Sequence, residues 1–191
     1  MPAITIVGLG PGGAELLTRE AWKVLCAAGE IYVRTSRHPA VHQLPSSVSV
    51  RSFDSIYASV RRPEDVYSAI CARILEVAEH TGNVTYAVPG DPAIAEVTVE
   101  LIREQAAERD LTIRVVSGLS FVGPTLCALG MDALPSLYLG DAFNIAALHH
   151  PPFSPDIPAL VCQLHGASIA SDVKLTLMNQ YPDEYQVALV H

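Results

Sequence analysis

Three glycine-containing segments carry the residue types best suited to binding a small ligand. They are Gly8-Leu9-Gly10-Pro11-Gly12-Gly13, then Pro89-Gly90-Asp91-Pro92, and finally Ser117-Gly118-Leu119-Ser120-Phe121. Glycine lets a ligand approach the backbone closely, because it has no Cβ atom. The carboxylate of Asp91 and the hydroxyl of Ser120 add groups that accept or donate hydrogen bonds. The chemistry indicated is recognition of a polar small molecule by loops that are rich in backbone groups.

Each of these segments follows a short apolar run that predicts a buried strand. The runs are 4–7, 84–88 and 111–116, and helices are expected after them at about 18–28, 94–109 and 121–129. Thr18 is a suitable N-cap for the first helix. Strands that alternate with helices form βαβ units and a parallel sheet. Ligands of such sheets bind beyond the carboxyl ends of the strands, so we expect the three loops to converge on one edge.

The remaining pattern completes an α/β fold with two lobes. Further strands are expected at 31–33, 48–50, 137–139, 159–164 and 185–190, and further helices at 64–80 and 168–180. The rest of 35–63 reads as irregular, and a connection of that length suggests a functional role. We expect an N-terminal lobe at 1–130 and a C-terminal lobe at 131–191, the second truncated because its last predicted strand has no cap.

Composition excludes several classes of protein. The 191 residues are 50% hydrophobic, which favours a folded core, and no apolar run is long enough to cross a membrane. The net charge of −8 disfavours nucleic acid as a partner. The four cysteines lie far apart without a metal-binding spacing, so we expect no metal, free thiols and a cytoplasmic protein.

The individual motifs leave alternatives open. The first segment also fits G-x-G-x-x-G, and an NADP-binding module could use Arg34 for a 2′-phosphate. Pro11 argues against it, because proline lacks the N–H that a pyrophosphate would need. The same loop could be a turn without a ligand. Asp91 could cap the next helix, and Phe121 could simply begin the core of its helix.

Taken in order, the motifs resemble the tetrapyrrole methylase superfamily, the class III S-adenosylmethionine methyltransferases. The family's V-G-x-G-P-G stands here at Val7 to Gly12, its G-D-P at Gly90-Asp91-Pro92, and its P-G-x-S at 117–120, where Ser117 replaces the proline. A finer resemblance is to the N-terminal domain of tetrapyrrole methylase/MazG proteins. It rests on the segments Tyr32-Val33-Arg34-Thr35, His38-Pro39, Asp54-Ser55-Ile56-Tyr57 and Tyr86 to Gly90, with Ala95-Glu96 and Thr98-Val99.

The resemblance implies two α/β lobes with S-adenosylmethionine bound in a cleft between them. The implied cofactor contacts are Leu9, Gly10, Pro11, Gly90, Asp91, Ile94, Ser120, Phe121 and Gln163. No catalytic residue is assigned, because methyl transfer from a sulfonium mainly needs the reactants to be positioned. His38, Asp54 and Tyr57 are interpreted as structural or substrate-facing. The acceptor is expected to be a small or tetrapyrrole-like molecule.

Two further partners follow from the same resemblance. Relatives are commonly dimers, so a homodimer is expected, and a MazG nucleoside triphosphate pyrophosphohydrolase domain is expected to be fused to this one in the full-length protein. The leading hypothesis is a methyltransferase that uses S-adenosylmethionine. The alternatives are a non-catalytic ligand-binding module that regulates the MazG domain, and the NADP-binding module.

Overall fold

The computed structural model describes residues 2–60 and 62–190, and the chain forms two compact units, residues 1–124 and 125–191. The first unit is built on a five-stranded sheet with the order β3-β2-β4-β1-β5, in which every pairing is parallel. Its strands are β1 (Ala3–Gly8), β2 (Glu30–Val33), β3 (Ser49–Ser52), β4 (Asn83–Val88) and β5 (Thr112–Val116). This parallel α/β arrangement confirms the fold class expected from the sequence.

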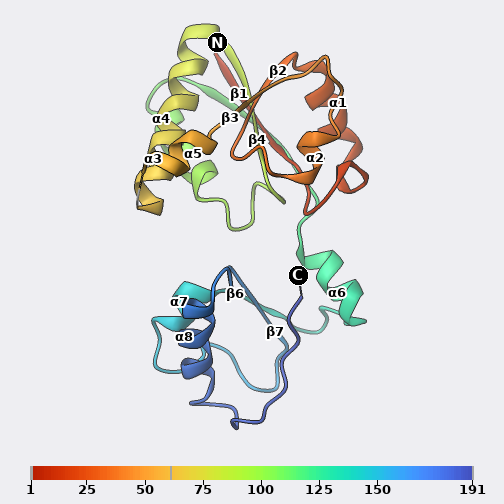
Figure 1. Cartoon of the computed structure of the whole chain (residues 1–191), viewed down its shortest axis with the longest axis vertical. Helices are drawn as coiled ribbons and strands as arrows, with labels where there is room; N and C mark the ends of the chain where they lie inside the picture. The colour runs from red at the N-terminus through yellow and green to blue at the C-terminus, as the bar shows by residue number, and fades with distance from the viewer. Residues whose placement is uncertain (1, 61, 191) are drawn as a thin grey trace. The chain divides into compact units, whose positions relative to one another are not determined.

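Helices cover both faces of this sheet (Figure 1). They are the 3-10 turn η1 (Ala14–Leu16) and the helices α1 (Arg19–Ala27), α2 (Pro39–His42), α3 (Asp54–Ser59), α4 (Pro63–Thr81) and α5 (Val97–Ala107). Helix α6 (Val122–Leu129) follows β5 and spans the division between the units. The sequence-based boundary after residue 130 lies just beyond α6.

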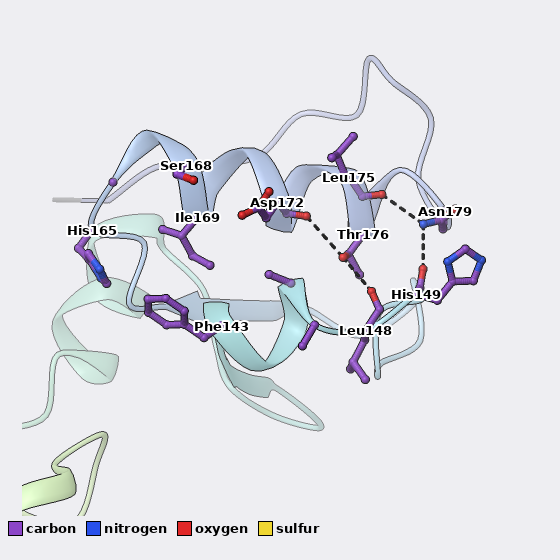
Figure 2. A pocket seen from close by; sticks show the side chains of 13 residues that line it. Phe143, Leu148, His149, His165, Ser168, Ile169, Asp172, Leu175, Thr176 and Asn179 are labelled. Carbon is purple, nitrogen blue, oxygen red and sulfur yellow. Dashed lines mark hydrogen bonds between the residues drawn. The ribbon is translucent and has the colours of Figure 1, made fainter. Parts of the chain in front are cut away.

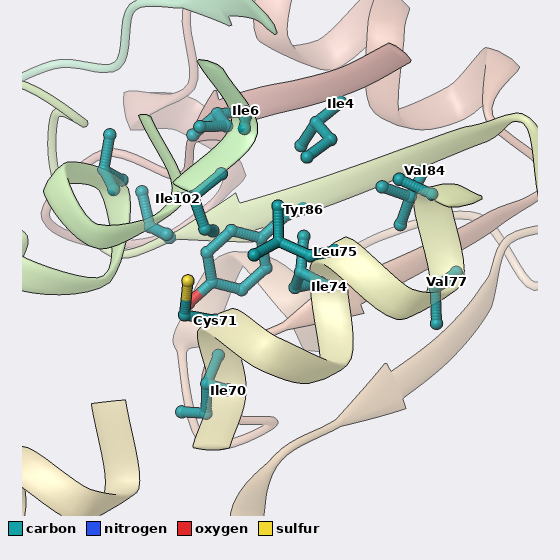
Figure 3. Packing of buried hydrophobic residues seen from close by; sticks show 14 of the residues in the cluster. Ile4, Ile6, Ile70, Cys71, Ile74, Leu75, Val77, Val84, Tyr86 and Ile102 are labelled. Carbon is teal, nitrogen blue, oxygen red and sulfur yellow. The ribbon is translucent and has the colours of Figure 1, made fainter. Parts of the chain in front are cut away.

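The larger hydrophobic core lies between the sheet and helices α4 and α5. In Figure 3, Tyr86 of β4 projects toward Ile74 and Leu75 of α4, with Ile102 of α5 beside them. Apolar residues spaced four apart along α4 lie in this core, since Ile70 and Ile74 are fully buried. A second core packs α1 and the segment around α2 against the opposite face.

Strands β1 and β4 form the point at which the topology changes direction. They are neighbours with Gly8 paired to Val88, yet the helices that follow them lie on opposite faces: α1 packs in the second core and α5 in the first. Because the two chains leave the sheet in opposite directions, a crevice opens beyond the strand ends. The fold therefore places its natural ligand position at the loops after β1 and β4.

The helix after β4 begins later than the sequence predicts. Ile94 lies in a turn, where its N–H bonds the carbonyl of Asp91 at 3.0 Å, and α5 starts at Val97. The apolar pattern of the predicted helix places Val97 on its inner face, but Val97 is 46% exposed, so this expectation is wrong. The cause is the segment from Asp91 to Ala95, which is held in a turn and ends at a positive φ of 55° at Ala95.

The segment 35–63 is more regular than expected. It contains the predicted short strand, as β3, and also the two short helices α2 and α3. Helix α2 spans only Pro39–His42, too short to show a helical period, and is capped by His38, whose Nδ1 accepts from Ala40 N–H at 3.3 Å. The Thr18 cap of α1 is confirmed, with Oγ1 accepting from Ala21 N–H.

The second unit contains a two-stranded parallel sheet and two helices. Its elements are β6 (Tyr138–Asp141), α7 (Ala142–Ala146), β7 (Ala159–Cys162) and α8 (Ala167–Leu177), with Ile145, Ile169 and Val173 in the core. The strand predicted at 185–190 is wrong: the segment has no strand pairing among the described residues, and Leu189 is 85% exposed. Hydrophobic residues alone do not make a strand without a neighbour to pair with. Nowhere in 2–60 and 62–190 is a helix long and apolar enough to span a membrane.

The core of the first unit gives a direct test of the fold. Ile74→Ala removes a fully buried side chain of α4 and should lower the free energy of unfolding by about 2–5 kcal/mol. Ser68→Ala, at an exposed position of the same helix, should change it by less than about 0.5 kcal/mol. Urea unfolding followed by circular dichroism measures both, and equal effects would contradict this packing.

Candidate ligand-binding site

The loops after β1 and β4 are joined directly through their backbones. Gly10 N–H donates to the Gly90 carbonyl at 3.0 Å, and Gly90 N–H donates to the Gly10 carbonyl at 2.8 Å. Both glycines have positive φ, 70° and 66°, a conformation that side-chain-bearing residues rarely adopt. The two loops therefore form one continuous surface at the carboxyl edge of the sheet, as the sequence predicts.

The third loop closes against the first two at a point where no side chain fits. A Cβ atom placed on Gly8 would lie 2.5 Å from the backbone of Gly118 and 2.6 Å from the Gly90 oxygen. A Cβ atom on Gly118 would collide with the same Gly90 oxygen. Three loops from far apart in sequence thus meet through bare backbone, which confirms the predicted convergence.

Thr18 connects the first and third loops. Its hydroxyl donates to the Ser117 carbonyl at 3.1 Å and accepts from Ala21 N–H at 3.1 Å. The same side chain therefore caps α1 and fixes the start of the third loop. The backbone at Ser117, where the family motif has proline, is held by this bond.

Asp91 shapes the middle loop instead of capping α5. Its Oδ1 accepts from Ala93 N–H at 2.8 Å and closes a turn six residues before that helix begins. Its Oδ2 has no hydrogen-bond partner among the described residues, and Asp91 is only half-buried. One carboxylate oxygen is therefore available to accept a hydrogen bond from a ligand.

The other predicted cofactor contacts of the first unit differ in which of their atoms are accessible to a ligand. Leu9 is fully buried in the second core, so only its backbone remains for a ligand. Pro11, Ile94 and Phe121 are each half-buried. Ser120 Oγ accepts from Val122 N–H at 3.0 Å, which leaves the hydroxyl proton free to donate.

A buried polar network, which the sequence reasoning did not identify, lies behind the middle loop. Arg34 Nη1 binds Glu96 Oε2 at 2.8 Å, and the Glu96 side chain is only 3% exposed. Thr98 donates to Glu96 at 2.8 Å, so the Tyr86 hydroxyl donates to Thr98 at 3.0 Å. Burial raises the pKa of Tyr86, which keeps this hydroxyl protonated. The network ties the end of β2 to the end of the middle loop.

The sequence offers one signal for this network, which is a charged residue at the end of a buried strand and another at the start of a helix. Arg34 directly follows β2. Glu96 is the N-cap residue of α5, but its side chain makes no capping hydrogen bond to that helix. A buried carboxylate needs a partner of opposite charge, so a cation near Glu96 could have been expected, but the sequence alone does not select Arg34. Arg34 Nε is buried without a hydrogen-bond partner among the described residues.

Asp54 has a structural role at the ends of β2 and β3. It accepts hydrogen bonds from Thr35 Oγ1 at 2.7 Å and Ser36 N–H at 3.0 Å, and also from the Ser36 hydroxyl. These hydrogen bonds hold the pKa of Asp54 well below its usual range. The carboxylate is therefore ionised and fully engaged, which suits a loop anchor better than a general base.

The NADP-binding alternative does not fit this geometry. In the dinucleotide-binding fold β1 lies beside β2, whereas here β4 lies between them. Gly10 N–H is already donated to Gly90, and Arg34 is already paired with Glu96. Neither group is free for the phosphates of NADP.

Gln163 is the one predicted contact in the second unit. It directly follows β7 at a φ of 68°, an uncommon conformation for a residue other than glycine, and its side chain is exposed. Backbone strain of this kind occurs often at functional positions. The structure therefore singles out Gln163 among the residues at the end of β7.

A groove of about 670 Å³ lies elsewhere, between α7 and α8 of the second unit (Figure 2). Its polar residues hold the unit together: Thr176 donates to the Leu148 carbonyl at 3.0 Å, and Asn179 donates to the His149 carbonyl at 2.8 Å. None of the nine predicted contacts lines it. Among residues 2–60 and 62–190, no cluster of ligating side chains suits a metal ion.

A parallel α/β sheet with glycine loops meeting at its topological switch point defines a class of small-ligand-binding folds. Residues 3–191 match the model of the tetrapyrrole (corrin/porphyrin) methylases, and the chain belongs to that family. The family is one of S-adenosylmethionine-dependent methyltransferases, the function class expected from the sequence. This confirms the family resemblance drawn from the three motifs.

Individual relatives agree with the family. The chain is 36% identical to the uncharacterized protein YabN of Bacillus subtilis (strain 168) over 98% of its own length and 38% of that protein's. It therefore spans about two fifths of this relative.

Solved structures share the fold at lower identity. Uroporphyrin-III-C-methyltransferase from Thermus thermophilus superposes with a TM-score of 0.68 at 23% identity, over 95% of this chain and 73% of that one. Cobalt precorrin-4 methyltransferase, a cobalamin biosynthetic enzyme, gives 0.62 at 16% identity, over 93% and 74%.

The meeting of the loops can be tested by adding one methyl group. Gly118→Ala puts a Cβ atom against the Gly90 carbonyl and should lower the free energy of unfolding by about 1–3 kcal/mol. Gly123→Ala is the matched control, because it lies in α6 with nothing within 4 Å of the added atom. That variant should be neutral or slightly stabilised. Urea unfolding that ranks the two variants equally would contradict the close approach of the loops.

Proposed function

We propose that the edge where the three glycine loops meet binds S-adenosylmethionine, and that the chain transfers its methyl group to a small, tetrapyrrole-like acceptor. The observation that carries this proposal is the joining of the first and middle loops by the reciprocal hydrogen bonds between Gly10 and Gly90. A surface of bare backbone beside Asp91 and Ser120 suits a ligand that must lie close to the sheet edge. Family membership supports the same ligand.

The available polar groups match the chemistry of such a ligand. The free oxygen of Asp91 can accept from a ribose hydroxyl or an ammonium group, and its charge favours a cation nearby. The Ser120 hydroxyl can donate to a ring nitrogen or a carboxylate, and Phe121 offers an apolar surface. Gln163 belongs to the second unit, and its amide can both donate and accept hydrogen bonds.

In this reaction the protein mainly has to position the methyl donor and the acceptor relative to each other. S-adenosylmethionine supplies a methyl group on a sulfonium, which is a good leaving group in an in-line displacement. The rigid turn at Asp91 and the Arg34–Glu96 pair behind it hold the middle loop in one conformation. Placing the reactants in line accounts for much of the rate of such reactions, so a dedicated general base is not required by the geometry.

Two features of the whole protein belong to the same proposal. Cys26, Cys71, Cys127 and Cys162 are all free, which supports a reducing compartment such as the cytoplasm. Exposed apolar side chains such as Leu134 and Leu175 of the second unit support a homodimer, because an interface would cover them.

A second candidate is a non-catalytic module that senses S-adenosylmethionine and regulates a fused MazG pyrophosphohydrolase. The observation that favours it is that most of the Bacillus subtilis relative lies outside the match. The two candidates differ in the full-length protein. Regulation requires that S-adenosylmethionine change the rate of nucleoside triphosphate hydrolysis, measured as pyrophosphate release. An unchanged rate at saturating ligand would eliminate this candidate.

Calorimetric titration with S-adenosylhomocysteine tests the proposed site. Asp91→Ala removes the free carboxylate oxygen and should weaken binding about tenfold, the effect of losing roughly 1.4 kcal/mol. The matched control is Asp132→Ala, since Asp132 Oδ1 closes a similar turn with Leu134 N–H at 3.0 Å in the second unit. That variant should bind like the wild type. Equal binding by both variants, or equal weakening, would remove Asp91 from the site.

A further inference from the structure

We propose that His38 and Gln43 are positioning residues that lock the first glycine loop in its ligand-binding conformation, and that protonation of His38 weakens this lock by breaking the cap of α2. The inference rests on the proposed function, because it assigns a proton-sensitive regulation to the same site. Neither residue is among the predicted cofactor contacts. Both act through the backbone of the loop between β1 and η1.

His38 holds the loop at the position where it joins the middle loop. Its Nε2 lies 3.0 Å from the Gly10 carbonyl, which also accepts from Gly90 N–H at 2.8 Å. Its Nδ1 accepts from Ala40 N–H at the start of α2. Since Nδ1 accepts, the ring proton is on Nε2, and the imidazole donates it to Gly10. The side chain is therefore neutral and engaged at both nitrogens.

Gln43 holds the other end of the same loop. Its Oε1 accepts a hydrogen bond from Ala14 N–H and lies 2.9 Å from where a Cβ atom on Gly13 would be. His38 and Gln43 therefore flank helix α2 in the sequence, and their side chains bind the loop at Gly10 and at Ala14. Gly12 and Gly13, between these two points, have wide conformational freedom. Because both ends of the loop are fixed, the loop has less conformational entropy left to lose when a ligand binds.

The surroundings of His38 oppose its protonation. Burial lowers the pKa of His38 below its ordinary 6.5, the hydrogen bond to Gly10 raises it, and the positive charge of Arg34 lowers it further. The other titratable groups nearby are Arg37 and His42 on its own segment and Glu15 on η1, which packs against α2. Protonation at Nδ1 leaves Nε2–H donating to Gly10, but it turns the Nδ1 acceptor into a donor facing Ala40 N–H. The cap of α2 is then lost, and with it the fixed placement of the His38 and Gln43 side chains on the loop.

The sign of the pH effect follows from this shift. The unfolded chain takes up a proton on His38 near pH 6.5, while the folded loop resists it to lower pH. The lock is therefore fully formed above about pH 6.5 and weakens as the pH falls below that value. Affinity for the ligand should fall over the same range.

Two substitutions separate the lock from general stability. His38→Gln keeps an N–H that can donate to Gly10 but cannot titrate, whereas His38→Leu removes the donor. At pH 7.5 we expect His38→Leu to weaken S-adenosylhomocysteine binding about tenfold, and His38→Gln to bind within about threefold of the wild type. Between pH 7.5 and 5.5 the affinity of the wild type should fall, and the affinity of His38→Gln should fall at least threefold less.

Hydrogen exchange of the Gly10 and Ala14 amides, which donate to the Gly90 carbonyl and to Gln43 Oε1, provides a readout without ligand. His38→Leu should speed exchange of the Gly10 amide at least tenfold, and Gln43→Ala should do the same for Ala14, while amides of α4 keep wild-type rates. Unchanged exchange in both variants, or a pH profile of His38→Gln that matches the wild type, would overturn the lock. If the wild type binds no S-adenosylhomocysteine, the proposed function fails, and the exchange rates still decide the lock.

Discussion

The close approach of three backbones at Gly8, Gly90 and Gly118 is the constraint on which the site depends. A Cβ atom on Gly8 or Gly118 would collide with the neighbouring loops. The parallel register brings the ends of β1, β4 and β5 to the same level, and glycine then allows their loops to touch. The helices after β1 and β4 lie on opposite faces, so the joined loops are left facing outward beyond the sheet edge.

A shell of polar side chains then holds these loops from behind. Thr18 links the first and third loops, the Arg34–Glu96 pair ties β2 to the middle loop, and His38 binds the Gly10 carbonyl. These groups come from segments that do not belong to the three motifs. A loop surface fixed in this way loses little conformational entropy when a ligand binds.

The sequence was sufficient for the parallel sheet, the long helices and the meeting of the loops, because each has a local pattern. Residues such as Ile70 and Ile74 reveal α4 by their spacing, and Thr18 marks the start of α1. The sequence was insufficient where the local structure depends on residues that are distant in the chain. Residues 185–190 are apolar but have no strand to pair with, and the turn made by Asp91 delays α5. The pairing of Arg34 with Glu96 depends on strand order, which a single sequence does not show.

The most direct test of the proposed ligand site is diffraction from crystals of the protein grown with S-adenosylhomocysteine. We expect ligand density at the carboxyl edge of the five-stranded sheet, within hydrogen-bonding distance of the Asp91 carboxylate and in contact with the backbone of Gly90. The hydrogen bonds between Gly10 and Gly90 should remain intact. Density confined to the groove between α7 and α8, or a ligand that separates these two glycines, would contradict the proposed site.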